Sequence, residues 1–172
     1  MTIRKIAFSG VIGAIYAVLT MVLAPISFGP LQLRVAEVLC ILPFFFPAST
    51  WGLFAGCLIA NLLSTYGLFD VVFGSLATLL ACLITAQIGR ADRQSVGSKL
   101  LACLPPVIMN GLIIGAVIAW MTARDTFWSA MILNGATVAL GEFIVMYVIG
   151  FPLMLILPKT GIFTFLKEKY GL

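Results

Sequence analysis

The chain has 172 residues, of which 62% are hydrophobic and only 9% are charged, and its formal net charge is +4. Soluble domains carry about 25% charged residues, so this composition excludes an ordinary soluble domain and indicates an integral membrane protein. The basic residues lie in short loops and tails, where they set membrane topology rather than form a nucleic-acid-binding surface.

The apolar runs predict an all-α membrane protein with six transmembrane helices, because several runs reach the ~20 residues that cross a bilayer. The runs are continuous rather than alternating, which favours helices over a β-barrel. The first run is longer than the apolar core of a signal peptide, so we expect it to be retained as a helix. In chain order, the predicted spans are about residues 6–24, 33–46, 50–64, 70–88, 100–121 and 134–157.

Proline and run length mark the irregular parts of this arrangement. The second and third spans are short, and a re-entrant pair is the alternative to two crossings; the number of crossings stays even in both cases. Pro105 and Pro106 predict a break or kink in the fifth span. A short amphipathic tail follows the sixth span, and residues 1–172 are predicted to form one domain.

The basic residues predict the orientation of the chain. If the N-terminus is cytoplasmic and the spans alternate, the inner segments hold eight basic residues and the outer segments hold two, as the positive-inside rule requires. Both termini are therefore expected in the cytoplasm. The inner residues are Arg4, Lys5, Arg90, Arg93, Lys99, Lys159, Lys167 and Lys169, and the outer residues are Arg34 and Arg124.

Polar residues within the predicted spans concentrate in the outer half of the membrane. Glu142 lies roughly 12 Å deeper than Asn134, at ~1.5 Å per residue. A carboxylate at depth costs roughly 2.5–3.5 kcal/mol, so Glu142 and Glu37 need a partner or a watery cavity. We expect a cavity open to the outside, lined by the candidate substrate-binding residues. These are Arg34, Glu37, Asn61, Asp70, Asn110, Trp120 and Glu142.

Structural explanations remain open for most of these residues. Arg34 and Glu37 share a helix face and could form an ion pair at an interfacial helix start. Asp70 could be a helix N-cap, and the asparagines could make interhelical hydrogen bonds. Glu142 is the hardest to explain in this way, because it lies far from either end of its span.

The first span carries small residues at a spacing of four, which lets a second helix approach closely. The pairs are Gly10 with Ala14 and Gly13 with Ala17. They predict either ordinary packing within the protein or docking of a partner subunit.

Several sequence features argue against an enzyme or a metal protein. Histidine is absent, and the chain has no Walker A, GxSxG or HExxH motif. The four cysteines, Cys40, Cys57, Cys82 and Cys103, lie in apolar runs without CxxC spacing and are expected to behave as small hydrophobes. No cofactor is therefore predicted, and so short a chain would need a partner to concentrate a solute.

The segment LQLRVAEVLCILPFFFPASTWGLFAGCLIANLLS, followed by GLFDVVFGSLATLLA, resembles the queuosine-precursor transporter (QueT) family. Members are substrate-binding S components of energy-coupling factor (ECF) transporters. The resemblance covers nearly the whole chain and implies a six-helix S-component bundle in the cell membrane. It also implies a transmembrane coupling protein and two cytoplasmic ATPases as partners, and deazaguanine substrates such as queuine and its aminomethyl relative. Gly10 and Ala14 occupy the place of the small-xxx-small motif typical of S components.

The residues allow recognition of such a ligand. Glu37 or Glu142 could accept from the ring N–H and amino groups, Asn61 or Asn110 could read the carbonyl, and Asp70 could pair with a cationic amine. The aromatic residues available for stacking are Tyr66, Phe69, Trp120 and Trp128. Two rival hypotheses are an S component for another flat vitamin, such as riboflavin or thiamin, and a membrane assembly factor that binds no small molecule. An intramembrane enzyme fares worst, because no nucleophile–base pair is recognisable.

Overall fold

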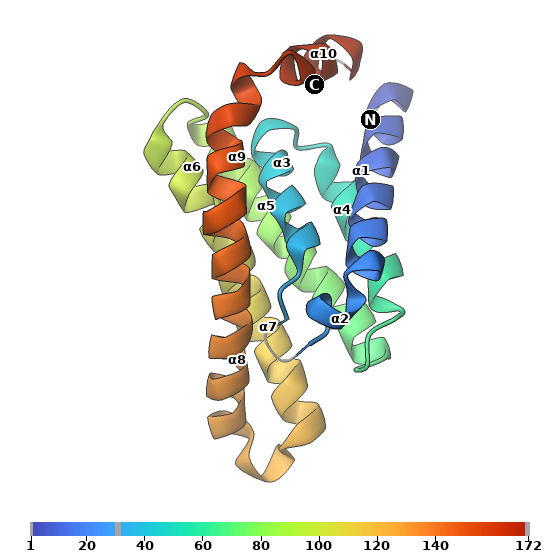
Figure 1. Cartoon of the computed structure of the whole chain (residues 1–172), viewed down its shortest axis with the longest axis vertical. Helices are drawn as coiled ribbons and strands as arrows, with labels where there is room; N and C mark the ends of the chain where they lie inside the picture. Colours follow the sequence, from blue (N-terminus) through green and yellow to red (C-terminus); the bar gives the residue numbers. More distant parts are fainter. Residues whose placement is uncertain (1, 30–31, 171–172) are drawn as a thin grey trace.

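The computed structural model describes residues 2–29 and 32–170, and within them every regular element is a helix (Figure 1). The α-helices are α1 (Ile3–Val22), α2 (Ala24–Ser27), α3 (Leu42–Phe45), α4 (Ser49–Asn61), α5 (Ser75–Ala91), α6 (Val96–Ala102), α7 (Leu104–Thr122), α8 (Phe127–Phe143), α9 (Phe151–Ile156) and α10 (Gly161–Tyr170). The 3₁₀ segments are η1 (Val35–Ile41), η3 (Arg124–Thr126) and η5 (Leu157–Lys159), and the π-helical segments are η2 (Asp70–Gly74) and η4 (Ile144–Gly150). This confirms the prediction of an all-helical chain.

Four helical stretches in the described residues are long and apolar enough to cross a membrane. They are Ile3–Val22, Asp70–Ala91, Val96–Thr122 and Arg124–Lys159. The second and third predicted spans are shorter: η1 and α3 together cover Val35–Phe45, and α4 has 13 residues. The count of six crossings therefore stays a prediction.

The longest helix begins earlier than the sequence suggests. α8, η4 and α9 form one continuous helical run from Phe127 to Ile156, whereas we placed the start of the sixth span near Asn134. At ~1.5 Å per residue, these 30 or so residues extend roughly 45 Å, which is longer than the ~30 Å apolar core of a bilayer. Glu142 lies near the middle of this run.

The double proline interrupts the fifth predicted span, as expected. α6 ends at Ala102 and α7 begins at Leu104, so that Pro105 and Pro106 occupy its first turn. At that position the missing proline N–H costs no helical hydrogen bond, and the fixed φ suits a helix start.

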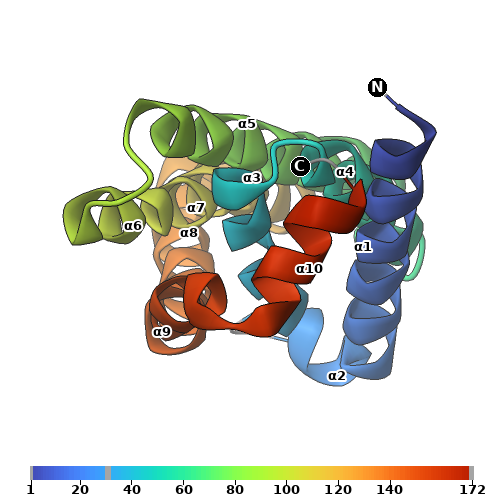
Figure 2. The same ribbon diagram turned by 90° about the horizontal axis from the view of Figure 1, so that it is seen from above.

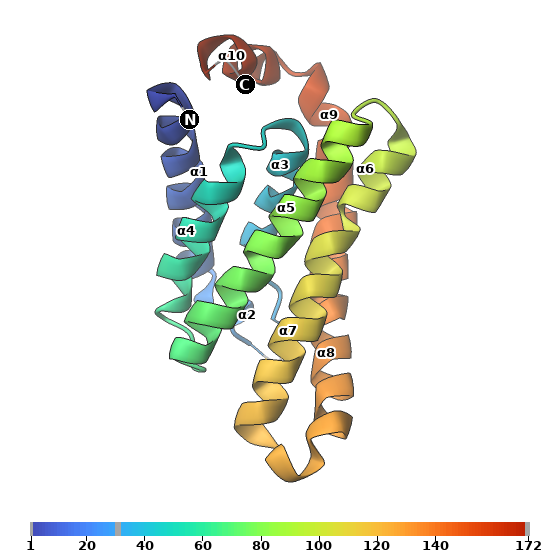
Figure 3. The ribbon, with the colours of Figure 1, turned by 180° about the vertical axis from the view of Figure 1, so that it is seen from behind.

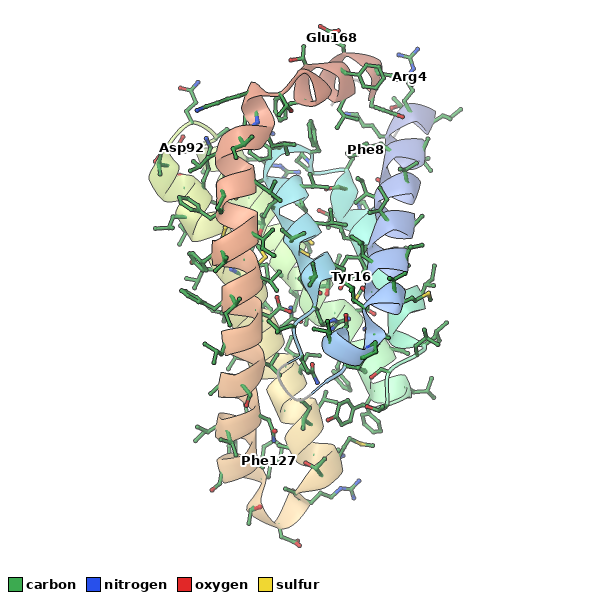
Figure 4. All side chains as sticks on the ribbon, in the orientation of Figure 1. Arg4, Phe8, Tyr16, Asp92, Phe127 and Glu168 are labelled. Atoms are coloured by element: carbon green, nitrogen blue, oxygen red, sulfur yellow. The ribbon has the colours of Figure 1, made fainter. Side chains whose placement is uncertain are left out.

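The two termini lie at the same end of the bundle, and α10 lies across that end (Figure 2). The turn between α7 and α8 projects at the opposite end (Figure 3). α7 packs along α8, α1 packs along α4, and α5 contacts both α4 and α7. Three charged residues, Arg4, Asp92 and Glu168, lie at the end with the termini (Figure 4).

The bundle buries polar side chains beside an apolar core, and it exposes many large apolar side chains. Glu37, Asn61 and Glu142 are completely buried, whereas Trp128 and Ile132 are each 74% exposed. Apolar surface of this extent is stable in lipid, where it has no water to avoid. The chain is therefore a multi-pass membrane protein.

α1 and α4 approach each other so closely that only glycine fits at the crossing. A Cβ added at Gly52 would overlap the carbonyl oxygen of Ser9, and a Cβ at Gly56 would overlap the carbonyl oxygen of Gly13. Gly13 in turn faces the carbonyl group of Gly52. The three glycines therefore let the two backbones touch, as small residues do in membrane helix pairs.

Candidate functional site

The stretch that holds Arg34 and Glu37 lies inside the bundle rather than at its surface. Both side chains are buried, with exposed fractions of 2% and 0%, respectively. Val35–Ile41 forms the 3₁₀ segment η1, which contacts α1, α5 and η4. The short, irregular second span therefore carries two charges into the protein interior.

Glu37 is held by three donors from three elements. Its Oε1 accepts hydrogen bonds from the hydroxyl groups of Tyr16 on α1 and Thr78 on α5, the latter at 3.0 Å. Its Oε2 accepts from the thiol of Cys40, at 2.9 Å. Tyr16 projects from α1 toward the interior, next to η1 (Figure 4). Both carboxylate oxygens are thus engaged by the protein itself.

Arg34 and Asn61 form a second group of contacts. Its Nη2 donates to Oδ1 of Asn61 and contacts the sulfur of Cys57 at 3.5 Å. The Asn61 amide donates to the backbone carbonyl of Asp70 at 3.0 Å and to the Cys57 sulfur at 3.3 Å. These contacts join the start of η1 to α4 and to the start of η2. Arg34 and Glu37 therefore make their hydrogen bonds to different partners and not to each other, unlike in the structural alternative of an ion pair between them.

Asp70 does not cap a helix, contrary to the structural alternative. Phe69 holds the N-cap position of η2, and the Asp70 side chain makes no capping hydrogen bond. The carboxyl group is buried, and its Oδ1 lies so close to Gly74 that a Cβ there would be 2.7 Å away. The same Cβ would lie 2.7 Å from Nδ2 of Asn61 and 3.4 Å from Cδ1 of Ile114.

Asn110 and Glu142 form a third polar pair, between α7 and α8. Nδ2 of Asn110 donates to Oε1 of Glu142 at 3.1 Å, and both side chains are completely buried. Asn110 lies one helical turn before Ile114, which faces Asn61 and Asp70 at Gly74. The pair therefore lies on the same side of α7 as the Arg34 and Asp70 contacts.

Four buried polar atoms in these groups have no hydrogen-bond partner among the described residues. They are Nε of Arg34, Oδ1 of Asp70, Oδ1 of Asn110 and Oε2 of Glu142. Most buried polar groups in proteins are hydrogen-bonded, and an unpaired one costs about 1–3 kcal/mol. The interior thus contains one donor and three acceptors that make no hydrogen bond to the described part of the protein.

The structure places Trp120 away from these residues. Its indole is 48% exposed, and the Arg124 guanidinium lies 4.8 Å above its ring. Trp120 contributes to an apolar groove of about 420 Å³ on the outside of the bundle, between η2 and α7, together with Phe69 and Phe73. The structure therefore does not bring Trp120 together with the other predicted site residues, because its face of α7 is turned outward, and its role in the site stays a prediction.

Among the other predicted aromatic residues, Tyr66 is the best placed. It packs against the cluster of Ile114, Ile118 and Val138, whereas Trp128 is 74% exposed and Phe69 is 42% exposed. Ile114 also borders Asp70 through Gly74, so Tyr66 lies near the polar interior.

Tyr16, Cys40 and Thr78 were missed by the sequence analysis. Tyr16 shares its helix face with Phe8, Ile12 and Thr20, all of which are buried. A tyrosine in the middle of a buried face must find a hydrogen-bond partner for its hydroxyl group, and this rule could have identified it. Thr78 and Cys40 give no such signal, since both residue types are common in apolar helices.

The four small residues of α1 fall on two different faces. Gly13 and Ala17 are buried, and Gly13 packs against α4. Gly10 and Ala14 are exposed, and a Cβ added at Gly10 would meet no atom within 4 Å. Gly13 and Ala17 therefore fit the alternative of packing within the protein, and of the four residues Gly10 and Ala14 are the two that are exposed.

Fold and interior together define a class of protein: a multi-pass helical membrane protein with a buried polar centre. The sequence matches the family model of the QueT transporter over residues 6–159, so the chain belongs to the QueT transporter family. Members of this family are transporters, and the chain is not an enzyme.

A curated relative supports the family membership over part of the chain. The chain is 40% identical over 72 residues to the queuosine precursor transporter QueT of Lactococcus lactis subsp. cremoris (strain MG1363). The alignment covers 41% of this chain and 42% of the relative, so it spans less than half of that protein. No solved structure matches the chain.

Proposed function

We propose that the chain is the S component of an ECF transporter and captures a queuosine precursor, queuine or its aminomethyl relative, from outside the cell. The observation that carries this proposal is the set of four buried, unpaired polar atoms on Arg34, Asp70, Asn110 and Glu142. Membership in the QueT transporter family and the name of the curated relative support the choice of substrate.

The unpaired atoms match the polar groups of a deazaguanine. Oε2 of Glu142 and Oδ1 of Asn110 belong to one bonded pair of side chains and present two acceptors to a ring N–H and its neighbouring amino group. Nε of Arg34 is a donor that suits the ring carbonyl, and Oδ1 of Asp70 suits the cationic amine of the aminomethyl form. Tyr66 is the aromatic residue available for stacking.

The contacts of Glu37 and Asn61 favour a structural role for these two residues over direct contact with the substrate. Both oxygens of Glu37 already accept hydrogen bonds, and Asn61 uses its amide oxygen and nitrogen within the protein. We therefore assign Glu37 and Asn61 to holding Arg34, η1 and η2 in place around the substrate.

The orientation in the membrane follows from the charge distribution. The end that carries both termini and α10 also carries Arg4 (Figure 4) and the turn between α5 and α6, to which Arg93 belongs, and we assign this end to the cytoplasm. Six crossings and an outward-facing polar centre complete the proposed topology. ATP hydrolysis by the two cytoplasmic ATPases of the proposed complex would then drive release of the substrate inward.

The substrate assignment is tested by isothermal titration calorimetry on detergent-purified protein with Glu142→Gln. The substitution replaces the free acceptor Oε2 by an amide that donates, so affinity for queuine or its aminomethyl relative is expected to fall by an order of magnitude or more. Guanine, riboflavin and thiamin complete the ligand panel. Glu168→Gln, at an exposed site on α10, is the matched control and should leave affinity unchanged.

Three results would contradict the assignment. Unchanged affinity in Glu142→Gln would remove Glu142 from the binding site. Tight binding of riboflavin or thiamin by the unmodified chain would replace the proposed substrate by a vitamin, and binding of none of the five compounds would favour the assembly-factor hypothesis.

The exposed small residues of α1 are the proposed contact with the transmembrane coupling protein. Ala14→Leu fills this surface without touching the interior, so it is expected to reduce co-purification of the coupling protein and ATPases about tenfold. Substrate affinity of the isolated chain should not change. Ala55→Leu makes the same change at an exposed position of α4 and should leave the complex intact. Equal loss in both variants would argue against a specific docking surface.

A further inference from the structure

A polar pocket lies at the end of the bundle that carries the termini, and none of the residues of the buried polar centre lines it. Its volume is about 420 Å³. Elements from four parts of the chain contribute: α3 and the residue after it, the turn between α5 and α6 with α6 itself, η5, and α10. The lining residues are Phe45, Phe46, Arg93, Gln94, Lys99, Pro158 and Phe163.

One wall of the pocket is cationic. Arg93 donates from Nε to the carbonyl oxygen of Gly89 at 3.1 Å, which holds the side chain against the end of α5 and leaves the other guanidinium N–H groups available. Lys99 lies in the last turn of α6. Among the described residues, the lining holds these two cations and no acidic residue.

The nearest acidic residue in the sequence, Asp92, is committed to the turn between α5 and α6. Its Oδ1 accepts from the backbone N–H groups of Gln94 and Ser95 at 2.9 and 3.1 Å, and its Oδ2 accepts from the Ser98 hydroxyl at 3.1 Å. These N–H groups stabilise the carboxylate and lower the pKa of Asp92. The hydrogen bonds of Asp92 thus go to the turn between α5 and α6, and none of them goes to Arg93 or Lys99.

The opposite wall of the pocket is aromatic. The ring of Phe163 on α10 lies 5.4 Å from the ring of Phe45 and 5.1 Å from that of Phe46. Phe45 and Phe46 are buried, whereas Arg93 is exposed. The pocket thus changes from charged at the bundle surface to apolar inside, just as a phospholipid changes from its charged headgroup to its apolar acyl chains.

We propose that this pocket binds the phosphate of an anionic phospholipid. Arg93 and Lys99 provide hydrogen bonds and charge for the phosphate oxygens, and the phenylalanine rings with Pro158 accept the adjoining glycerol and acyl groups. Basic pockets between membrane helices on the cytoplasmic side suit anionic headgroups, and this end is the cytoplasmic one in the proposed orientation. The bound lipid would fasten α10 to the α5–α6 turn.

The proposal is tested by thermal unfolding of the full chain in detergent, with added short-chain phosphatidylglycerol or phosphatidylcholine. Phosphatidylglycerol is expected to raise the unfolding temperature at a concentration at least tenfold lower than phosphatidylcholine. The double variant Arg93→Gln with Lys99→Gln should lose this preference. Arg4→Gln with Lys5→Gln removes the same two charges from α1, at the same end but outside the pocket, and should keep the preference.

Other outcomes overturn the proposal. Equal effects of the two lipids, or equal loss in the two double variants, would mean diffuse attraction rather than a site. An equal effect of inorganic phosphate alone would replace the lipid by a free phosphate anion. Native mass spectrometry of the unmodified chain with both lipids provides a readout that needs no variant, and preferential retention of phosphatidylglycerol is the supporting result.

Discussion

Replacing Glu37 by alanine is expected to lower the free energy of unfolding by about 3 kcal/mol or more. The substitution leaves the donors of Tyr16, Cys40 and Thr78 buried without their acceptor, and each unsatisfied buried group costs about 1–3 kcal/mol. These donors come from α1, η1 and α5, so the loss loosens three elements at once. Unfolding by sodium dodecyl sulfate in mixed micelles, followed by tryptophan fluorescence, measures the change.

Two controls separate the role of Glu37 from a general effect of losing a carboxylate. Glu168→Ala makes the same change at an exposed position and should alter stability by no more than about 0.5 kcal/mol. Glu37→Gln keeps an acceptor for Tyr16 and Thr78, so it should destabilise less than Glu37→Ala. If Glu37→Ala were as stable as the unmodified chain, Glu37 would not be the anchor of these elements.

The second large effect is expected from a single methyl group at Gly52. Because the added Cβ would overlap the carbonyl oxygen of Ser9, Gly52→Ala must push α1 away from α4 along their contact. Overpacking of this kind costs about 1–3 kcal/mol, and the obstacle here is backbone, which cannot rotate aside. We therefore expect a loss at the upper end of this range, measured by the same unfolding titration.

Gly10→Ala is the matched control for this prediction. It adds the same methyl group to α1 at a position with open space, and alanine favours the helix over glycine by up to about 1 kcal/mol. It should therefore leave stability unchanged or raise it. Equal stability of Gly10→Ala and Gly52→Ala would show that α1 and α4 do not cross as closely as described.

The sequence alone determined the class of the protein and much of its helical organisation. Composition and run length identified a membrane protein, and Pro105 with Pro106 predicted the break between α6 and α7. These features are local, because hydropathy and proline geometry act on the residues that carry them. The sequence also singled out Arg34, Glu37 and Glu142 as candidate site residues, because a charged residue stands out in an apolar run.

Only the tertiary structure decided which of these residues keep a buried polar atom unpaired within the described residues. Glu37 meets Tyr16 and Thr78, which lie 21 and 41 residues away in the sequence, and its acceptors are satisfied. Glu142 meets Asn110 across 32 residues and keeps one oxygen unpaired.

The sequence alone also did not reveal how each helix is rotated about its own axis. This rotation turned Trp120 outward, and it placed Gly13 inside and Gly10 outside. The physical reason is that both faces of a membrane helix are apolar, so hydropathy does not tell the lipid-facing side from the packed side. Close packing and hydrogen bonds between distant segments make that choice.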